Sequence, residues 1–255
     1  MEEDKLKKIE NKNGRLGQVI TGLLILGLVF AVFNQFQLLT MRSGGTMIPT
    51  GVAAVQAAVI PTGVPIIYGG ELGISYDDIS PNDQSSADRT IRILGNLDRT
   101  ITLEGENLDR YIDITSQISC EYCCGAQSII VRREDVESMN EKIDAAIEAG
   151  QITEEQAEEY RQNAGDAACG CAHSFAMRGV AKYLIIEHGS EFTDEEILDE
   201  LGKLKTLFFP SQMAAKAAVM EEQGIEFSYA NLGSNSYRGI ERSASGSGGG
   251  MVGGC

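Results

Sequence analysis

The chain has 255 residues, of which 43% are hydrophobic, so it can bury a sizeable core and is not a disordered acidic tail. Its 37 Asp and Glu residues against 21 Lys and Arg residues give a formal charge of -16. Because this charge repels phosphate backbones, we expect no nucleic-acid partner. The six cysteines are too few for a disulfide-dense scaffold.

An apolar segment, residues 16–40, comes near the start of the chain. Its uncharged, predominantly apolar run extends from Val19 to Phe33, and about 20 predominantly apolar residues span a bilayer as a helix. We expect a single-pass signal-anchor rather than a cleaved signal peptide, because the run is long and no clear small-residue cleavage site follows it. Five basic residues precede the segment and only Arg42 follows it before Arg89. This bias predicts a cell-membrane protein with residues 1–15 in the cytoplasm and the bulk of the chain extracytoplasmic.

The segment after the anchor, residues 41–64, is rich in Gly and Pro and is predicted to be a linker. From Pro65 to Val131, short runs of β-branched and aromatic residues are separated by Gly, Asn and Asp turns. These runs are Ile66–Tyr68, Thr90–Leu94, Thr100–Leu103 and Tyr111–Ile118. We expect them to form a small antiparallel β region.

From residue 134 onward the sequence patterns are typical of helices. Residues 134–166 contain 11 acidic and two basic residues and predict an acidic helical hairpin, with Thr153 and Gln156 as a capping box at the start of its second helix. The hairpin is a candidate surface for a protein partner. Further helices are predicted at Ser174–Glu187, from the capping box Thr193–Glu196 to about Thr206, and at Ser211–Gln223.

Together these elements predict an α+β fold. Residues 65–224 would form a Cys-rich α+β ectodomain, with the acidic hairpin at 134–166 as an insertion. Residues 225–255 are predicted to be a flexible Gly/Ser-rich tail. At its end, Cys255 suggests an exposed thiol for intermolecular contact, or a mobile arm that transfers metal; we favour the first interpretation slightly.

Five of the six cysteines lie in two compact motifs, Cys120-Glu-Tyr-Cys123-Cys124-Gly and Cys169-Gly-Cys171-Ala-His173. Thiolate and imidazole are ligands of soft and borderline metals, so the sequence predicts a zinc or copper(I) site. An iron–sulfur cluster is compatible with the same ligand types. The candidate ligands are Cys120, Cys123, Cys124, Cys169, Cys171 and His173. The 44 residues between Cys124 and Cys169 are not a zinc-finger spacing, but the ends of a helical hairpin return close together, so the motifs can meet in space.

Two other interpretations of the cysteines stay open. Outside the cytoplasm they would oxidise to structural disulfides, with Cys120, Cys123 or Cys124 paired to Cys169 or Cys171, giving a disulfide-stapled interaction domain without metal. Alternatively, the adjacent cysteines would be the reactive pair of a thiol–disulfide or electron-transfer protein. An enzyme of another kind is not favoured, because the chain has no G-x-S-x-G, Walker, H-E-x-x-H or G-x-G-x-x-G motif in a suitable context.

The Cys-Gly-Cys-x-His run, the helix after it and the acidic Asp-Glu-Glu-Ile helix resemble the uncharacterised PCYCGC-motif proteins. The resemblance covers about residues 169–207. It departs from the motif at its start, where Asp166-Ala-Ala-Cys169 stands in place of Pro-Cys-Tyr-Cys. The resemblance implies a membrane-attached, cysteine-rich protein that binds metal.

Overall fold

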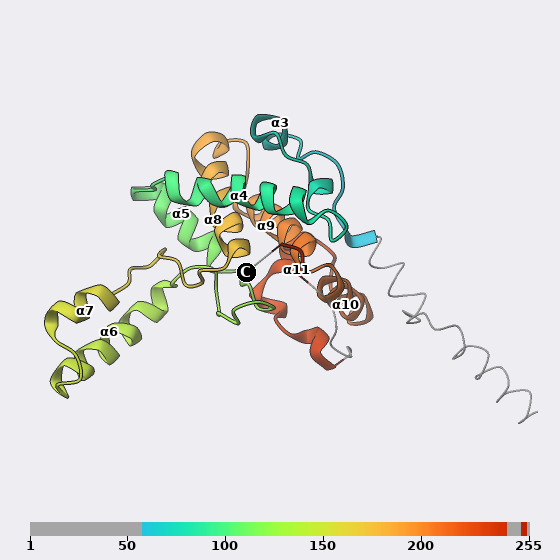
Figure 1. Cartoon of the computed structure of the whole chain (residues 1–255). Helices are drawn as coiled ribbons and strands as arrows, with labels where there is room; N and C mark the ends of the chain where they lie inside the picture. The colour runs from blue at the N-terminus through green and yellow to red at the C-terminus, as the bar shows by residue number, and fades with distance from the viewer. Residues whose placement is uncertain (1–57, 244–250, 254–255) are drawn as a thin grey trace, which may run out of the picture. The chain divides into compact units, whose positions relative to one another are not determined.

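The computed structural model describes residues 58–243 and 251–253, and within these residues it contains helices and turns but no β-strand (Figure 1). In chain order, the helical elements are α3 (Tyr68–Leu72), η1 (Tyr76–Asp78), α4 (Gln84–Thr100), α5 (Gly105–Thr115), α6 (Arg133–Glu148), α7 (Glu154–Tyr160), α8 (Ala172–His188), α9 (Asp194–Phe208), α10 (Pro210–Glu222), α11 (Tyr229–Gly233), η2 (Asn235–Tyr237) and η3 (Ile240–Ser243).

The predicted antiparallel β region is wrong, and with it the α+β fold class. Thr90–Leu94 lies inside α4, and most of Tyr111–Ile118 lies inside α5. In α4 the buried side chains include Ala87, Ile91 and Leu94, and a spacing of three to four residues is the period of a helix. Packing of this face against the core outweighs the β preference of its Thr and Ile residues.

The predicted transmembrane helix, residues 16–40, lies outside the described residues, as do the N-terminal residues 1–15. No helix in the described part of the chain is both long and apolar enough to cross a membrane. Of the predicted linker, residues 58–64 are described, and Val59 is buried against the core.

The three helices predicted after the second cysteine motif are confirmed as α8, α9 and α10. The capping box at the start of α9 is also confirmed, because the backbone N–H groups of Glu196 and Thr193 each donate to the other residue's side chain. α8 and α9 pack on each other at the centre of the core, with α4 against α8 and α11 against α9. This arrangement fixes the N-terminus of α8, which carries the second cysteine motif.

Two helix crossings are close enough that only glycine fits. A Cβ atom on Gly179 of α8 would lie 2.0 Å from the backbone oxygen of Leu94 in α4. A Cβ atom on Gly202 of α9 would lie equally close, 2.0 Å, to the backbone oxygen of Tyr229 in α11. The helix backbones therefore touch directly at both crossings, and any side chain there would force them apart.

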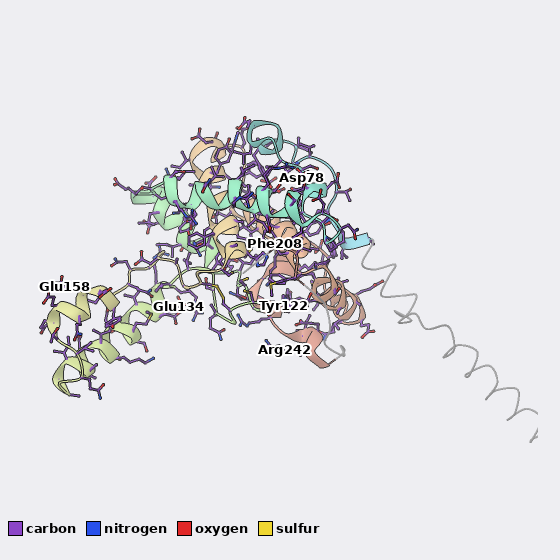
Figure 2. All side chains as sticks on the ribbon, viewed as in Figure 1. Asp78, Tyr122, Glu134, Glu158, Phe208 and Arg242 are labelled. Carbon is purple, nitrogen blue, oxygen red and sulfur yellow. A yellow bond between two sulfur atoms is a disulfide. The ribbon has the colours of Figure 1, made fainter. Side chains whose placement is uncertain are left out.

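α6 and α7 occupy the range of the predicted acidic hairpin. The Thr153–Gln156 capping box is present at the start of α7, and α6 has no buried residue. Figure 1 shows the pair projecting away from the other helices, and Figure 2 shows Glu158 on its outer part and Glu134 nearer the core, which contains Phe208. The two helices therefore project from the core, and we call them the α6–α7 excursion.

Backbone hydrogen bonds close the base of this excursion. The N–H of Val131 donates to the carbonyl of Asp166 at 2.7 Å, and the N–H of Gly165 donates to the carbonyl of Val131 at 2.9 Å. Ile130 and Ala167 form an isolated antiparallel bridge. The segments that follow the first cysteine motif and precede the second therefore lie side by side.

Part of the segment predicted as a flexible tail packs on the core. α11, η2 and η3 lie in it, and α11 buries Ala230 and Leu232. Near the end of the chain, Val252 is 1% exposed, and its N–H donates to the carbonyl of Phe208 at 2.9 Å. The described residues 251–253 are thereby attached to the end of α9.

Replacing Gly179 with Ala tests the α4–α8 crossing. Since the new Cβ would meet a backbone oxygen, we expect Gly179→Ala to lower the free energy of unfolding by roughly 2–4 kcal/mol. Urea unfolding of the full chain followed by circular dichroism measures this. The matched control is Gly70→Ala in α3, where the Cβ meets no atom within 4 Å, so the change should be neutral or slightly stabilising. Equal unfolding midpoints for the two variants would contradict the direct backbone packing.

Candidate metal centre

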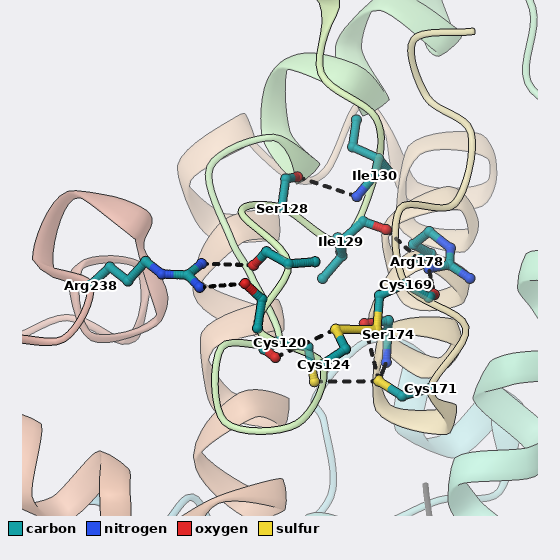
Figure 3. The surroundings of a disulfide bond; sticks show 12 residues. Cys120, Cys124, Ser128, Ile129, Ile130, Cys169, Cys171, Ser174, Arg178 and Arg238 are labelled. Atoms are coloured by element: carbon teal, nitrogen blue, oxygen red, sulfur yellow. Dashed lines mark hydrogen bonds between the residues drawn. A yellow bond between two sulfur atoms is a disulfide. The ribbon is translucent and has the colours of Figure 1, made fainter. Parts of the chain in front are cut away.

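The cysteines come from one loop and from the start of one helix. Cys120, Cys123 and Cys124 lie in the loop between α5 and α6, and Cys169 and Cys171 immediately precede α8. Hydrogen bonds between residues 118 and 129 and between 129 and 168 hold the loop beside the start of α8. Figure 3 shows the sulfur atoms of the two motifs facing one another.

One of the pairings considered from the sequence is present. Cys124 and Cys169 form a disulfide with their Cα atoms 6.6 Å apart. Cys123 is also disulfide-bonded. Cys120 and Cys171 are the free cysteines of the described residues. The loop and the segment before α8 are thus joined covalently, and two thiols stay available.

The two free thiols lie in contact. Their sulfur atoms are 3.4 Å apart, with Cys120 fully buried and Cys171 half-buried. Cys171 is the N-cap of α8, and its sulfur accepts a hydrogen bond from the backbone N–H of Ser174 at 3.4 Å. The N-cap position places this sulfur at the positive end of a helix of 17 residues.

Cys171 carries the negative charge of the pair. The contact with the Cys120 thiol, together with those with His173 and Ser174, lowers the pKa of Cys171 to about 4. The same contact with Cys171, and burial, raise the pKa of Cys120 far above its ordinary value. A thiolate is the form that binds metals and attacks disulfides, so Cys171 is prepared for either reaction.

His173 is fixed in one orientation. Its ring is fully buried against Phe208 and Phe209, with centroids 4.7 and 5.1 Å away, and its Nε2 lies 2.7 Å from the carbonyl oxygen of Val252. Because a carbonyl only accepts hydrogen bonds, Nε2 carries the proton and Nδ1 carries the lone pair when the ring is neutral. Histidine ligands of metals commonly donate their second N–H to a carbonyl in this way.

The structure brings all six candidate ligands together. The ligand atoms of Cys120, Cys123, Cys171 and His173 all lie within 4.8 Å of one another. Those of Cys124, Cys169 and Cys171 form a second group with the same limit. In the first group Cys120, Cys171 and His173 are available to hold a soft metal ion, whereas two of the three sulfur atoms of the second group are joined in the Cys124–Cys169 disulfide.

A buried ionic cluster borders the sulfur atoms, and the sequence analysis missed it. Lys205 and Lys216 donate to the same oxygen of Glu121 at 2.9 and 3.3 Å, and all three side chains are fully buried. Burial lowers the pKa of Lys205 to about 8, although Glu121 opposes this. Burial alone would raise the pKa of Glu121, but the two ammonium groups hold it below its ordinary value. Two cations against one anion give these three residues a net positive charge beside Cys120, and Arg238 and the buried Glu241 add one charge of each sign nearby.

Two arginines hold the backbone around the cysteines (Figure 3). Arg178 of α8 is 1% exposed and donates to the carbonyls of Ile129 and Cys169, both at 3.0 Å. Arg238 donates to the carbonyls of Ala126 and Gly125 at 2.7 and 2.8 Å. The loop and the segment before α8 are therefore held by hydrogen bonds as well as by the disulfide.

Comparison with known proteins gives no relative: no family model matches the chain, and no curated protein or solved structure is significantly similar to it. The resemblance to PCYCGC-motif proteins stays a prediction. The function of the site is therefore inferred from its residues and geometry.

Alkylation of the metal-free chain tests the assignment of the thiolate. At pH 6 an ordinary thiol with a pKa of about 8.5 is almost entirely protonated, whereas Cys171 is ionised. We therefore expect iodoacetamide to modify Cys171 and to leave the buried Cys120 unmodified, with the rate falling as the pH drops toward 4. Mass spectrometry of peptides measures the labelling, and the urea-unfolded chain is the control, in which the selectivity should vanish. Equal labelling of both cysteines in the folded chain would contradict the assignment.

Proposed function

We propose that the chain binds one soft metal ion, zinc or copper(I), through Cys120, Cys171 and His173. The observation that carries this proposal is the convergence of two free sulfur atoms on an imidazole whose Nε2 is bound to a carbonyl. Two thiolates on one tetrahedral zinc ion would be about 3.8 Å apart, given Zn–S bonds of about 2.3 Å. The observed separation of 3.4 Å is close to this value, so metal binding needs only a small movement of the sulfur atoms.

The state of Cys123 would set how many protein ligands the ion has. Cys123 lies in the same group as these three ligands but is disulfide-bonded. Two thiolates and one imidazole are a sufficient set for copper(I), and they can hold zinc with one coordination position open. Once reduced, Cys123 would complete a three-cysteine, one-histidine set, which is typical of structural zinc sites.

The burial of the ligands favours stable binding. Cys120 and His173 are fully buried, whereas Cys171 is half-buried. Cys123 is also half-buried, so a metal ion would reach the site from the side of Cys123 and Cys171. The net positive charge of the cluster formed by Lys205, Lys216 and Glu121 would offset the negative charge that thiolate ligands bring.

Thiol–disulfide exchange is a second candidate, because the Cys171 sulfur lies within 4.8 Å of both sulfur atoms of the Cys124–Cys169 disulfide. Attack of the Cys171 thiolate on one of them would form a new disulfide and release the other sulfur as a thiolate. Anaerobic purification separates the candidates. Retained metal with reduced Cys120 and Cys171 favours metal binding, whereas a metal-free chain whose disulfides redistribute among the three cysteines favours exchange.

Replacing His173 with Gln tests the metal site. The Gln amide can still donate to the Val252 carbonyl, but it lacks the imidazole lone pair. We expect zinc affinity, measured by competition with a chromophoric chelator, to fall about 10–100-fold. The matched control is His188→Gln at the other end of α8, where His188 contacts Glu71 and Glu191. This control should keep the affinity of the original chain. Equal affinity of the two variants would contradict the role of His173.

The place of this site in the cell is a separate proposal. The apolar residues 16–40 and the basic residues before them support a membrane anchor with the site outside the cytoplasm. The Cys124–Cys169 disulfide is of the kind found in oxidising compartments. We expect the full chain to stay with membranes after an alkaline carbonate wash, and a chain without residues 16–40 to be released. Release of both chains would contradict the anchor.

A further inference from the structure

We propose that reduction of the Cys124–Cys169 disulfide opens a second metal position that shares the Cys171 sulfur with the first. The reduced chain would then hold two ions bridged by one thiolate. This inference rests on the proposed function, because the first ion is the one bound by Cys120, Cys171 and His173.

The geometry points to a shared ligand because Cys171 belongs to both groups of donors. Its sulfur lies within 4.8 Å of the ligand atoms of Cys120 and His173 and also within 4.8 Å of the sulfur atoms of Cys124 and Cys169. A thiolate sulfur has several lone pairs and can bind two ions at once. In proteins with two-metal sites the ions are about 3.5–4 Å apart, a distance that one bridging sulfur can span.

The disulfide is the element that keeps the second position closed. Its sulfur atoms are bonded to each other and carry no negative charge, so they are poor ligands. A dithiol such as dithiothreitol supplies two electrons and two protons. The bond between the sulfur atoms of Cys124 and Cys169 breaks, two thiols form, and the dithiol becomes a cyclic disulfide. Metal binding then releases the protons of the thiols.

The scaffold would keep the two sulfur atoms near Cys171 after this reduction. Arg178 holds the carbonyl of Cys169 itself, and Arg238 holds the carbonyl of Gly125, the residue after Cys124. These hydrogen bonds do not depend on the disulfide (Figure 3). Cys124 is exposed whereas Cys169 is buried, so the reductant has access from the Cys124 side.

The local charge also suits a centre with two ions. When Cys123 is reduced as well, all five cysteines of the two motifs can be thiolates. Five thiolates and two zinc ions together carry one net negative charge. The neighbouring cluster of Lys205, Lys216 and Glu121 carries one net positive charge and lies next to Cys120. The buried cations would therefore balance the loaded site.

Zinc stoichiometry of the full chain tests the proposal. Under anaerobic conditions we expect about one zinc per chain before reduction, and two after treatment with dithiothreitol and its removal by gel filtration. The control is the double variant Cys124→Ser and Cys169→Ser, which should bind one zinc in either state. If the original chain still binds one zinc after reduction, the second position is wrong while the proposed function stands. If it binds no zinc in either state, and no copper(I) under the same conditions, the proposed function fails as well.

Cobalt(II) as the probe tests whether Cys171 is shared. Two ions joined by one sulfur are magnetically coupled, so we expect the electron paramagnetic resonance signal per cobalt of the reduced chain to fall by at least half when the second ion binds. Cys171→Ser should weaken both positions; serine is a preferred N-cap, so α8 should still form, which circular dichroism checks. Two bound ions with undiminished signals, or loss of only one ion in Cys171→Ser, would overturn the shared ligand.

Discussion

The buried guanidinium of Arg178 holds together the two segments that carry the cysteine motifs. Arg178 bonds to the carbonyls of Ile129 and Cys169 and, at 2.9 Å, to the carboxylate of Asp98 in α4. A buried charge is costly unless it is paired and hydrogen-bonded, so these three partners must stay in place for the core to be stable. The adjacent Gly179 lets α4 approach α8 closely enough for the ion pair to form. The positions of both cysteine motifs depend on this arrangement.

The fold was predictable where local signals act alone. The Thr193–Glu196 capping box marks the start of α9 because its hydrogen bonds form between neighbouring residues. The strands predicted at Thr90–Leu94 and Tyr111–Ile118 were wrong. That prediction used the β-strand propensity of the β-branched residues, whereas the spacing of Ala87, Ile91 and Leu94 is that of a helix. Packing against α8 decides between the two, and that contact joins residues far apart in the sequence.

The sequence was sufficient to predict which residues could be ligands of the candidate site, but not the residues that surround them. Cysteine and histidine spacing identifies the donors, and a hairpin explains how the motifs meet. The buried Lys205 was not predictable, because lysine is almost never fully buried unless it is paired, and its partner Glu121 lies 84 residues away. The same holds for the contact of His173 with Val252, which spans 79 residues. Such partners become visible only when the chain is folded.

Backbone hydrogen bonds close the base of the α6–α7 excursion. The geometry of the site therefore does not depend on how many residues lie between its two cysteine motifs. The backbone bonds of Val131 with Gly165 and Asp166 hold the ends together regardless of what lies between them. An excursion of another length, or a single tight turn, would leave the sulfur atoms where they are. A search for proteins with the same centre should therefore leave the interval open, and require instead the two cysteine motifs and an arginine seven residues after the second cysteine of the second motif.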